Sequence, residues 1–303
     1  MNDDYEPYYS NNTIPKCGLK RIFYYSGSLT LAYPNDLFAI GISMPRKYAK
    51  GFIEKGTLRF GCAKEWIDHA NKYATGKGDI QEGVFAAYEL DDLNGVLEGL
   101  KDNPGSHHIR LKSSHSDLVY LVNDKTISLP TYCFHTLRFG DFKMGCEEGK
   151  LFISVFLSPR YFQGMADGNS WLKENELPYE EQHVFVIIYN PEKFIDMIFD
   201  AITSIGIDRS NIIYKNVEYK NIDIPFAKQA NHPNELFIKN EQFFDQREGR
   251  IVVNVDNEEL ITRCKQPISV GSLEDMCILY DHYHAGGLTL NYYLDEKDNE
   301  WLY

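Results

Sequence analysis

One stretch of the sequence, HVFVIIYNPEKFIDMIFDAITSIG at 183–206, constrains the fold more than any other. Its first part is the strongest apolar run of the chain and predicts a central β-strand. Pro191 then opens an amphipathic helix. A buried strand followed by a one-sided helix predicts a sheet core with flanking helices. The apolar face of the helix comprises Phe194, Met197, Ile198 and Ile202.

The rest of the chain is rich in short strands. From about Val84 onward, apolar segments are separated by Gly, Asn and Pro, which is typical of antiparallel strands joined by turns. The chain has no internal repeat or low-complexity linker, and 303 residues are enough for one large domain. We therefore expect a polar N-terminal lead at 1–18 and a single α+β domain at 19–303, with a mostly antiparallel sheet.

The N-terminal third predicts a further group of elements. RIFYYSGSL indicates a strand at Arg21–Tyr25 and a turn, and PRKYAKGFIEKG indicates a helix that ends at Gly56. A short strand follows in TLRFG, and CAKEWIDHANKYA is helical by the spacing of its apolar residues. The next segment, TGKGDIQEG, is a glycine-rich loop that lacks the spacing of a phosphate-binding P-loop.

Composition disfavours some classes of function. The formal net charge of −13 argues against a protein that holds a long nucleic acid by neutralising its phosphates. No apolar run approaches the ~20 residues of a membrane span, and the first residues, MNDDYEPYYSNN, contain no apolar signal segment. The six cysteines form no C-x-x-C pair, which favours reduced thiols. We therefore expect a soluble, cytoplasmic protein.

Metal sites and nucleophiles are not indicated. The two histidines of YDHYHAGG would share a strand face, but no third ligand stands at zinc spacing. Cys133 and His135 lie two residues apart on one strand, whereas a catalytic Cys–His pair usually comes from distant segments. A buried structural thiol is the favoured interpretation of Cys133, and we expect no metal cofactor.

The segment FFDQREGRIVVN at 243–254 carries the strongest chemical signal. Its second half predicts a buried strand, whereas its first half places charges at the mouth of that strand. Alternation along a strand would put Gln246 and Glu248 on one face and Arg247 on the other. An amide beside a carboxylate can bind a ribose hydroxyl and stabilise the oxocarbenium-like transition state of C–N or C–O cleavage. The alternative is a surface pair, with Glu248 bridged to Arg250 or to a lysine.

The longer segment ELFIKNEQFFDQREGRIVV resembles a pattern of bacterial ADP-ribosyltransferase-like proteins, in which a phenylalanine–lysine element precedes [QE]-x-E-x-R at an apolar strand. Q-x-E is also the third motif of the arginine–serine–glutamate type of ADP-ribosyltransferase. RIFYYSGS, YAKGFIEKGTLRFG and GDIQEG resemble the first strand, the helix, the second strand and a later loop of that fold. The resemblance covers about residues 20–85 and 180–255 and implies a split antiparallel sheet with NAD bound between its halves.

The resemblance also implies roles for individual residues. Glu248 would be catalytic, and Gln246 would face the acceptor. Arg21, Tyr24 or Tyr25 would hold the nicotinamide end of NAD, since a tyrosine ring can stack on nicotinamide. Core packing is an equal alternative for one of the tyrosines, because alternation sends them to opposite faces.

The resemblance also concerns two further arginines and the second motif of that family. Arg59 and Arg250 are candidate partners of the pyrophosphate, because an arginine fork matches phosphate oxygens; ion pairs with nearby acids are the alternative. The Ser-Thr-Ser triplet of the second motif has no clear counterpart. KSSHSD at 112–117 and YCFHT at 132–136 are the two candidates.

We therefore expect an ADP-ribosyltransferase, a glycosyltransferase that uses NAD as its substrate. By resemblance it would act as a toxin or phage-defence effector and transfer ADP-ribose to a protein side chain or a nucleic-acid base, RNA included. An antitoxin would then bind it, with the acidic N-terminal lead as one contact. The incomplete second motif leaves an alternative, a non-enzymatic module of the same fold that binds or senses a partner.

Overall fold

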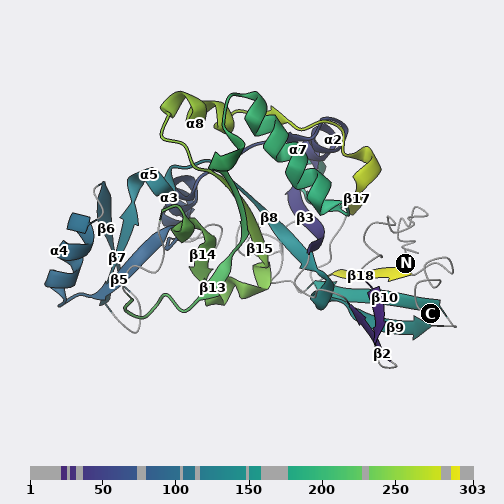
Figure 1. Cartoon of the computed structure of the whole chain (residues 1–303), viewed down its shortest axis with the longest axis horizontal. Helices are drawn as coiled ribbons and strands as arrows, with labels where there is room; N and C mark the ends of the chain where they lie inside the picture. Colours follow the sequence, from purple (N-terminus) through teal and green to yellow (C-terminus); the bar gives the residue numbers. More distant parts are fainter. Residues whose placement is uncertain are drawn as a thin grey trace.

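The computed structural model shows a mixed α/β protein with one large antiparallel sheet and several helices (Figure 1). The mixed class and the mostly antiparallel sheet expected from the sequence are confirmed. The predicted polar lead at 1–18 lies outside the described residues. Within the described part, no helix is long and apolar enough to cross a membrane. The described residues are 22–25, 28–31, 37–73, 80–102, 105–112, 117–147, 150–157, 177–226, 232–280 and 288–293.

The large sheet has the strand order β12-β15-β8-β3-β11-β17, and every neighbouring pair is antiparallel. β11 is the strand predicted from the strongest apolar run, and it is buried from Val184 to Ile188. β15 is buried along its whole length, as the sequence also predicted. Strands of this kind need cover on both faces. The six strands are β12 (Ile212–Asn216), β15 (Glu248–Val253), β8 (Thr131–Arg138), β3 (Leu37–Pro45), β11 (His183–Ile188) and β17 (Cys277–Tyr280).

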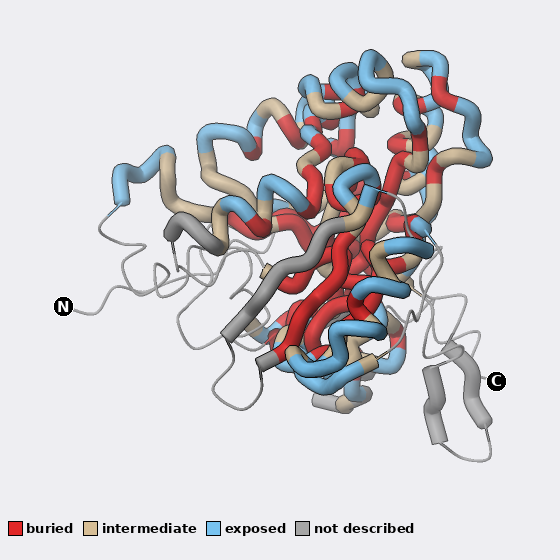
Figure 2. Tube along the Cα trace, turned by 90° about the vertical axis from the view of Figure 1, so that its left-hand side faces the viewer, coloured by how far each residue is buried: buried red, intermediate tan, exposed pale blue. Residues whose placement is uncertain are grey.

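Three helices cover one face of this sheet (Figure 1). α7 (Pro191–Ser204) begins at the predicted proline, and most of its apolar face is buried on the sheet. α2 (Arg46–Lys55) and α8 (Glu258–Lys265) contribute Phe52 and Cys264 to the same hydrophobic cluster. Figure 2 shows the buried residues concentrated in the central strands and the exposed ones on the outer helices.

The opposite face of the sheet carries two separate apolar clusters. At one end, Ala39, Leu137 and Phe185 pack against β10 and β18 of a small sheet ordered β18-β10-β9. At the other end, Val252 packs against α3, α5 and two strands of a small sheet ordered β5-β7-β6. These elements are β9 (Lys143–Glu147), β10 (Lys150–Leu157), β18 (Leu288–Tyr293), β5 (Val84–Glu89), β6 (Ser106–Lys112), β7 (Asp117–Asn123), α3 (Ala63–Tyr73) and α5 (Asp124–Ile127).

Between these two clusters the same face of the large sheet is polar. Side chains alternate along a strand, so Gly41 and Ser43 follow Ala39 on this face of β3. The same alternation brings polar side chains of β8, β11 and β15 to this face, between the positions that join the two clusters. We use the name polar strip for Ser43, Cys133, His135, His183, Glu248 and Arg250.

The remaining elements connect these layers or lie at their edges. β1 and β2 pair antiparallel, and β1 lies where the first strand was predicted, whereas most of the predicted turn falls outside the described residues. β4 follows α2 as predicted, and α4 covers the outer face of β5 and β7. The helices α4, α5 and α8 were not predicted. The elements not yet given are β1 (Ile22–Tyr25), β2 (Ser28–Leu31), β4 (Thr57–Leu58), β13 (Glu218–Lys220), β14 (Ile238–Asn240), β16 (Ile268–Ser269), α4 (Leu93–Asp102), η1 (Phe139–Asp141), η3 (Tyr179–Glu181), η4 (Arg209–Asn211), η5 (Asn234–Phe237), η6 (Glu241–Gln246) and η7 (Glu274–Met276).

Gly56 ends α2 in the left-handed region, with φ 58°. A Cβ at this position would lie 2.3 Å from the carbonyl oxygen of Gly271 and 2.5 Å from Cγ2 of Val270. We expect Gly56→Ala to lower the free energy of unfolding by about 2–4 kcal/mol, because left-handed strain adds to an overlap with fixed backbone. Urea denaturation measures this change.

Gly51 provides the control within the same helix, since nothing lies within 4 Å of its Cβ position. Gly51→Ala should raise the free energy of unfolding by about 0.5–1 kcal/mol, because alanine loses less backbone entropy in a helix. An unchanged Gly56→Ala, or a destabilised Gly51→Ala, would contradict this account of how α2 ends.

Candidate functional site

A cavity of about 490 Å³ opens over the polar strip. Every member of the strip except Arg250 lines it. The other walls of the cavity come from segments outside the large sheet. They are residues between Arg59 and Trp66, the turn that carries Glu82, and Lys239 in β14. A cavity of this size with a few converging polar groups is typical of a small-molecule site.

Gln246 and Glu248 both line the cavity, but not through the strand alternation expected from the sequence. Gln246 ends a 3-10 helix, η6 (Glu241–Gln246), and Arg247 is left-handed, with φ 46°, before β15 begins. Arg247 does not line the cavity, and its Nη1 lies 3.0 Å from Oδ1 of Asp141. The prediction that Gln246 lies on the strand was therefore wrong, and a turn brings it beside Glu248.

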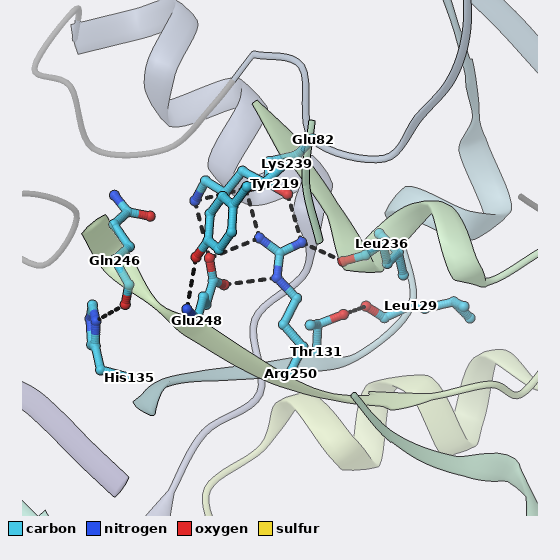
Figure 3. Close-up of polar contacts among 10 residues, drawn as sticks. All are labelled: Glu82, Leu129, Thr131, His135, Tyr219, Leu236, Lys239, Gln246, Glu248 and Arg250. Atoms are coloured by element: carbon cyan, nitrogen blue, oxygen red, sulfur yellow. Dashed lines mark hydrogen bonds and ion pairs between the residues drawn. The ribbon is translucent and has the colours of Figure 1, made fainter. Parts of the chain in front are cut away.

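Hydrogen bonds fix this turn to β8. His135 Nδ1 donates to the carbonyl oxygen of Gln246 at 2.6 Å. The backbone N–H and the hydroxyl of Thr136 donate to the carbonyl oxygen of Arg247 at 2.8 and 2.7 Å. His135 is also directly opposite Glu248 in the register of β8 and β15. The imidazole, the amide and the carboxylate all line the same cavity, although His135 contacts the backbone of Gln246 and not its amide (Figure 3).

Arg250 is fully buried behind the cavity and holds two carboxylates (Figure 3). Its Nη1 and Nη2 donate to the two oxygens of Glu82 at 2.7 and 2.9 Å. Its Nε and Nη2 donate to the two oxygens of Glu248 at 2.8 and 3.1 Å. Nη1 also donates to the carbonyl oxygen of Leu236, in η5 (Asn234–Phe237), at 2.5 Å. One planar guanidinium thus joins β15, the turn before β5 and η5.

Lys239 supplies a second cation. Its Nζ lies 3.3 Å from Oε1 of Glu82 and 3.2 Å from Oε2 of Glu248. The hydroxyl of Tyr219 accepts a hydrogen bond from the backbone N–H of Glu248 at 2.7 Å. Glu82, Lys239, Glu248 and Arg250 form the ion-pair cluster, which has no net formal charge. Only such pairing makes burial of these groups tolerable, because an isolated buried charge is very unfavourable.

The ion-pair cluster keeps Glu248 ionised. Burial alone raises the pKa of this carboxyl, but the charges of Arg250 and Lys239 outweigh burial and hold the pKa well below its usual range. Burial, and then the negative charge of Glu248, raise the pKa of the Cys133 thiol, which is therefore protonated at neutral pH. Burial lowers the pKa of His135 to about 4, so its imidazole is neutral.

The other walls combine aromatic rings with a few polar groups. Phe60 and Trp66 line the cavity, and the Trp66 ring centre lies 5.5 Å from the guanidinium carbon of Arg250. Arg59 is exposed at the rim and makes no ion pair with any described residue. The hydroxyl oxygen of Ser43 is buried and has no hydrogen-bond partner in the described part of the chain. The cavity thus presents ring faces, a cation and an unsatisfied hydroxyl to a ligand.

Three residues expected from the sequence meet at this cavity: Glu248, Gln246 and Arg59. Arg250 does not line it, because its guanidinium is enclosed by the carboxylates of Glu82 and Glu248. The alternative to a catalytic Glu248, a bridge to Arg250 and to a lysine, is present as well, although the bridge is buried and not on the surface.

The other expected residues lie elsewhere. Arg21 is outside the described residues, and Tyr24 and Tyr25 lie in β1 with side chains outside the described part. Of the two candidate second motifs, 132–136 lies in β8 and lines the cavity, whereas most of 112–117 is outside the described residues. The histidines of YDHYHAGG also fall outside them.

Glu82, Lys239 and Ser43 have clear positions at the cavity that the sequence did not predict. Glu82 belongs to GDIQEG and Lys239 to the phenylalanine–lysine element, so both segments carried a signal. Their local patterns do not show that they meet Glu248. Ser43 lies inside an apolar strand, where only the strand's place in the sheet shows what a hydroxyl would face.

The site has to be interpreted from its own chemistry. No protein-family model matches the chain, and no curated protein and no solved structure matches it. Within the described residues, no group of three or more His, Cys, Asp or Glu side chains is placed to hold a metal ion.

The ion-pair cluster gives a direct test of its own importance. Arg250→Leu would leave two buried carboxylates with Lys239 as their shared cation, so it should lower the free energy of unfolding by about 3–5 kcal/mol in urea denaturation. Arg209→Ala is the matched control. Arg209 also binds two carboxylates, Asp196 and Asp200, but all three side chains are about half exposed or more.

The control should lose less than about 1 kcal/mol, because water screens exposed ion pairs. Equal losses in the two variants would show that the buried cluster is no more important to stability than a surface pair.

Proposed function

We propose that the cavity binds NAD and that the protein is an NAD-dependent ADP-ribosyltransferase. The observation that carries the proposal is the ionised carboxylate of Glu248, which lines an aromatic-walled cavity beside Gln246. This is the pair to which the resemblance assigns catalysis and acceptor contact. An ADP-ribosyltransferase-like fold belongs to the same proposal, with NAD bound over the polar strip between the two apolar clusters.

In the proposed reaction, the bond between C1′ of the ribose and N1 of nicotinamide breaks. Nicotinamide leaves as a neutral molecule with the electron pair of that bond, and positive charge develops on the ribose ring. A new bond forms between C1′ and an oxygen or nitrogen of the acceptor, which loses its proton. A preorganised carboxylate stabilises the developing charge, and Glu248 is ionised at neutral pH.

Other cavity groups suit the remaining parts of NAD. The rings of Phe60 and Trp66 offer faces for nicotinamide or adenine. Arg59, exposed at the rim, suits the pyrophosphate, to which an arginine fork can donate two hydrogen bonds. The buried hydroxyl of Ser43 can bind a ribose hydroxyl or the nicotinamide amide. Arg21 and the two tyrosines of β1 remain candidates for the nicotinamide end.

The proposed biological role is that of a toxin or phage-defence effector in the cytoplasm. The acceptor would be a protein side chain or a nucleic-acid base, RNA included. The formal net charge of −13 favours brief contact with a nucleic acid over extended binding. A toxin needs an inhibitor in its own cell, so an antitoxin is the proposed protein partner.

One observation favours a second function, a non-enzymatic module that binds or senses a ligand. Both oxygens of Glu248 accept hydrogen bonds from Arg250, and one of them also lies 3.2 Å from Nζ of Lys239. A carboxylate shared in this way has less charge available for a reacting ribose. NAD or a related ligand would then bind without turnover.

The test uses NAD labelled in its adenylate part, together with a cell extract as the source of acceptors. Wild type should place label in protein or nucleic acid and release nicotinamide. Glu248→Gln should lower the transfer rate by about a hundredfold or more, since a preorganised group at a developing charge contributes about 10²–10³ in rate. Glu259→Gln should transfer like wild type, because Glu259 is an exposed carboxylate of α8 that pairs with Arg263.

Thermal unfolding of Glu248→Gln is measured alongside, because this change also removes a partner of Arg250. Rates are compared only at temperatures at which both variants are folded. A wild type that transfers no label and releases no nicotinamide would rule out the enzyme. Calorimetric binding of NAD without turnover would favour the second function, and a fully active Glu248→Gln would reject the assigned site.

A further inference from the structure

His135 has a defined position relative to the reacting centre proposed above. Its Cα is the register partner of the Glu248 Cα across β8 and β15, and both side chains line the cavity. Residues directly opposite each other on one sheet face have Cβ atoms about 4.5–5.5 Å apart. The two side chains therefore begin at neighbouring positions on the cavity wall, and a group bound between them can contact both.

The hydrogen bond to Gln246 determines which ring nitrogen of His135 carries the proton. A carbonyl oxygen only accepts, so Nδ1, 2.6 Å from the Gln246 oxygen, must be the donor. In the neutral ring, Nε2 is then the nitrogen with the lone pair. A histidine whose Nδ1–H is held by an oxygen atom is oriented to accept a proton at Nε2.

The surroundings of His135 keep the ring neutral. Burial is the largest influence and lowers its pKa to about 4. The carbonyl of Gln246 and the negative charge of Glu248 act in the opposite direction, whereas the positive charge of Lys239 acts in the same direction as burial. Cys133, on the same face of β8, is a protonated thiol and adds no charge. At neutral pH the imidazole is in the form that can take up a proton.

We propose that His135 is the catalytic base that accepts the proton of the acceptor. This inference rests on the proposed ADP-ribosyl transfer. As the acceptor oxygen or nitrogen bonds to C1′, its proton passes to Nε2, and nicotinamide leaves with the electron pair of the C1′–N1 bond. Water then takes the proton from the imidazolium, which restores the neutral ring.

Glu248 and His135 have different roles in the proposed reaction. Glu248, with a pKa well below its usual range, is a poor proton acceptor but a permanent negative charge. His135 is the stronger base of the two and carries no charge before the reaction. Glu248 therefore stabilises the ribose cation, and His135 removes the proton that the acceptor must lose.

A substitution can distinguish a purely structural role of His135 from its proposed role as a catalytic base. Thr136 fixes the same turn through two hydrogen bonds to the Arg247 carbonyl, so the turn does not depend on His135 alone. In His135→Asn, the amide Nδ2 can still donate to the Gln246 carbonyl, but the side chain offers no basic nitrogen. The variant keeps the clamp and removes the base.

The experiment measures transfer of label from NAD to a cell extract at different pH values, and the Kd for NAD by calorimetry. His135→Asn should bind NAD within about threefold of wild type and transfer about a hundredfold more slowly at neutral pH. Its rate should rise about tenfold per pH unit, because hydroxide must take the proton instead. The wild-type rate should be nearly constant from about pH 6 to 8, where Nε2 is already deprotonated.

The outcomes separate the two proposals. Equal transfer rates and pH profiles in both proteins would overturn the role of His135 and leave the enzyme intact. A wild type that neither transfers label nor releases nicotinamide overturns both. A second measurement needs no variant: nitrogen NMR of wild type labelled in histidine shows which nitrogen is protonated. A proton on Nδ1 of His135 supports the proposal, and a proton on Nε2 overturns it.

Discussion

The buried guanidinium of Arg250 is the interaction on which the rest of the site depends. Such a group is strongly destabilising in a core unless its N–H donors find acceptors, and here the acceptors come from three parts of the chain. Glu248 is two residues away, whereas Glu82 is 168 residues away and Leu236 offers a backbone carbonyl from η5. Because the guanidinium is planar and rigid, these segments can lie only where their oxygens meet it. The turn before β5 and the strand β14, which follows η5, thereby become walls of the cavity.

The same pairing would both enable and limit the proposed catalytic role of Glu248. Two cations keep the carboxylate ionised, but they also share its charge. The two partners are not equivalent, because Lys239 lines the cavity and Arg250 does not. A bound ligand with a positive charge, such as the nicotinamide ring of NAD, would compete with Lys239 for the carboxylate and leave Arg250 in place. The inner pair then serves as the structural support, and the outer pair is the one that a ligand can alter.

The sequence predicts the features of this fold that are determined locally. The strand β11, the proline start of α7 and the glycine end of α2 all follow from neighbouring residues. α4 was missed although its leucines and valine have helical spacing, because its two glycines weaken a helix prediction. α8 was missed because it buries a single side chain. The shared direction of Gln246 and Glu248 was expected from strand alternation but arises from a left-handed Arg247, a conformation that an arginine does not signal. The contact of Glu82 with Arg250 is beyond any local pattern, since only the folded topology joins them.

The polar strip supports a ligand-binding role for this face of the sheet. Ser43, Cys133, His135 and His183 stand where apolar side chains would merge the two clusters of this face into one core. Each such side chain, fully buried, would contribute about 1.5–3 kcal/mol. The chain instead keeps a cavity there, with a hydroxyl that has no partner in the described part and a histidine held neutral by burial. Local costs of this kind are characteristic of functional sites. The sheet gives up stability where a ligand would supply the missing contacts.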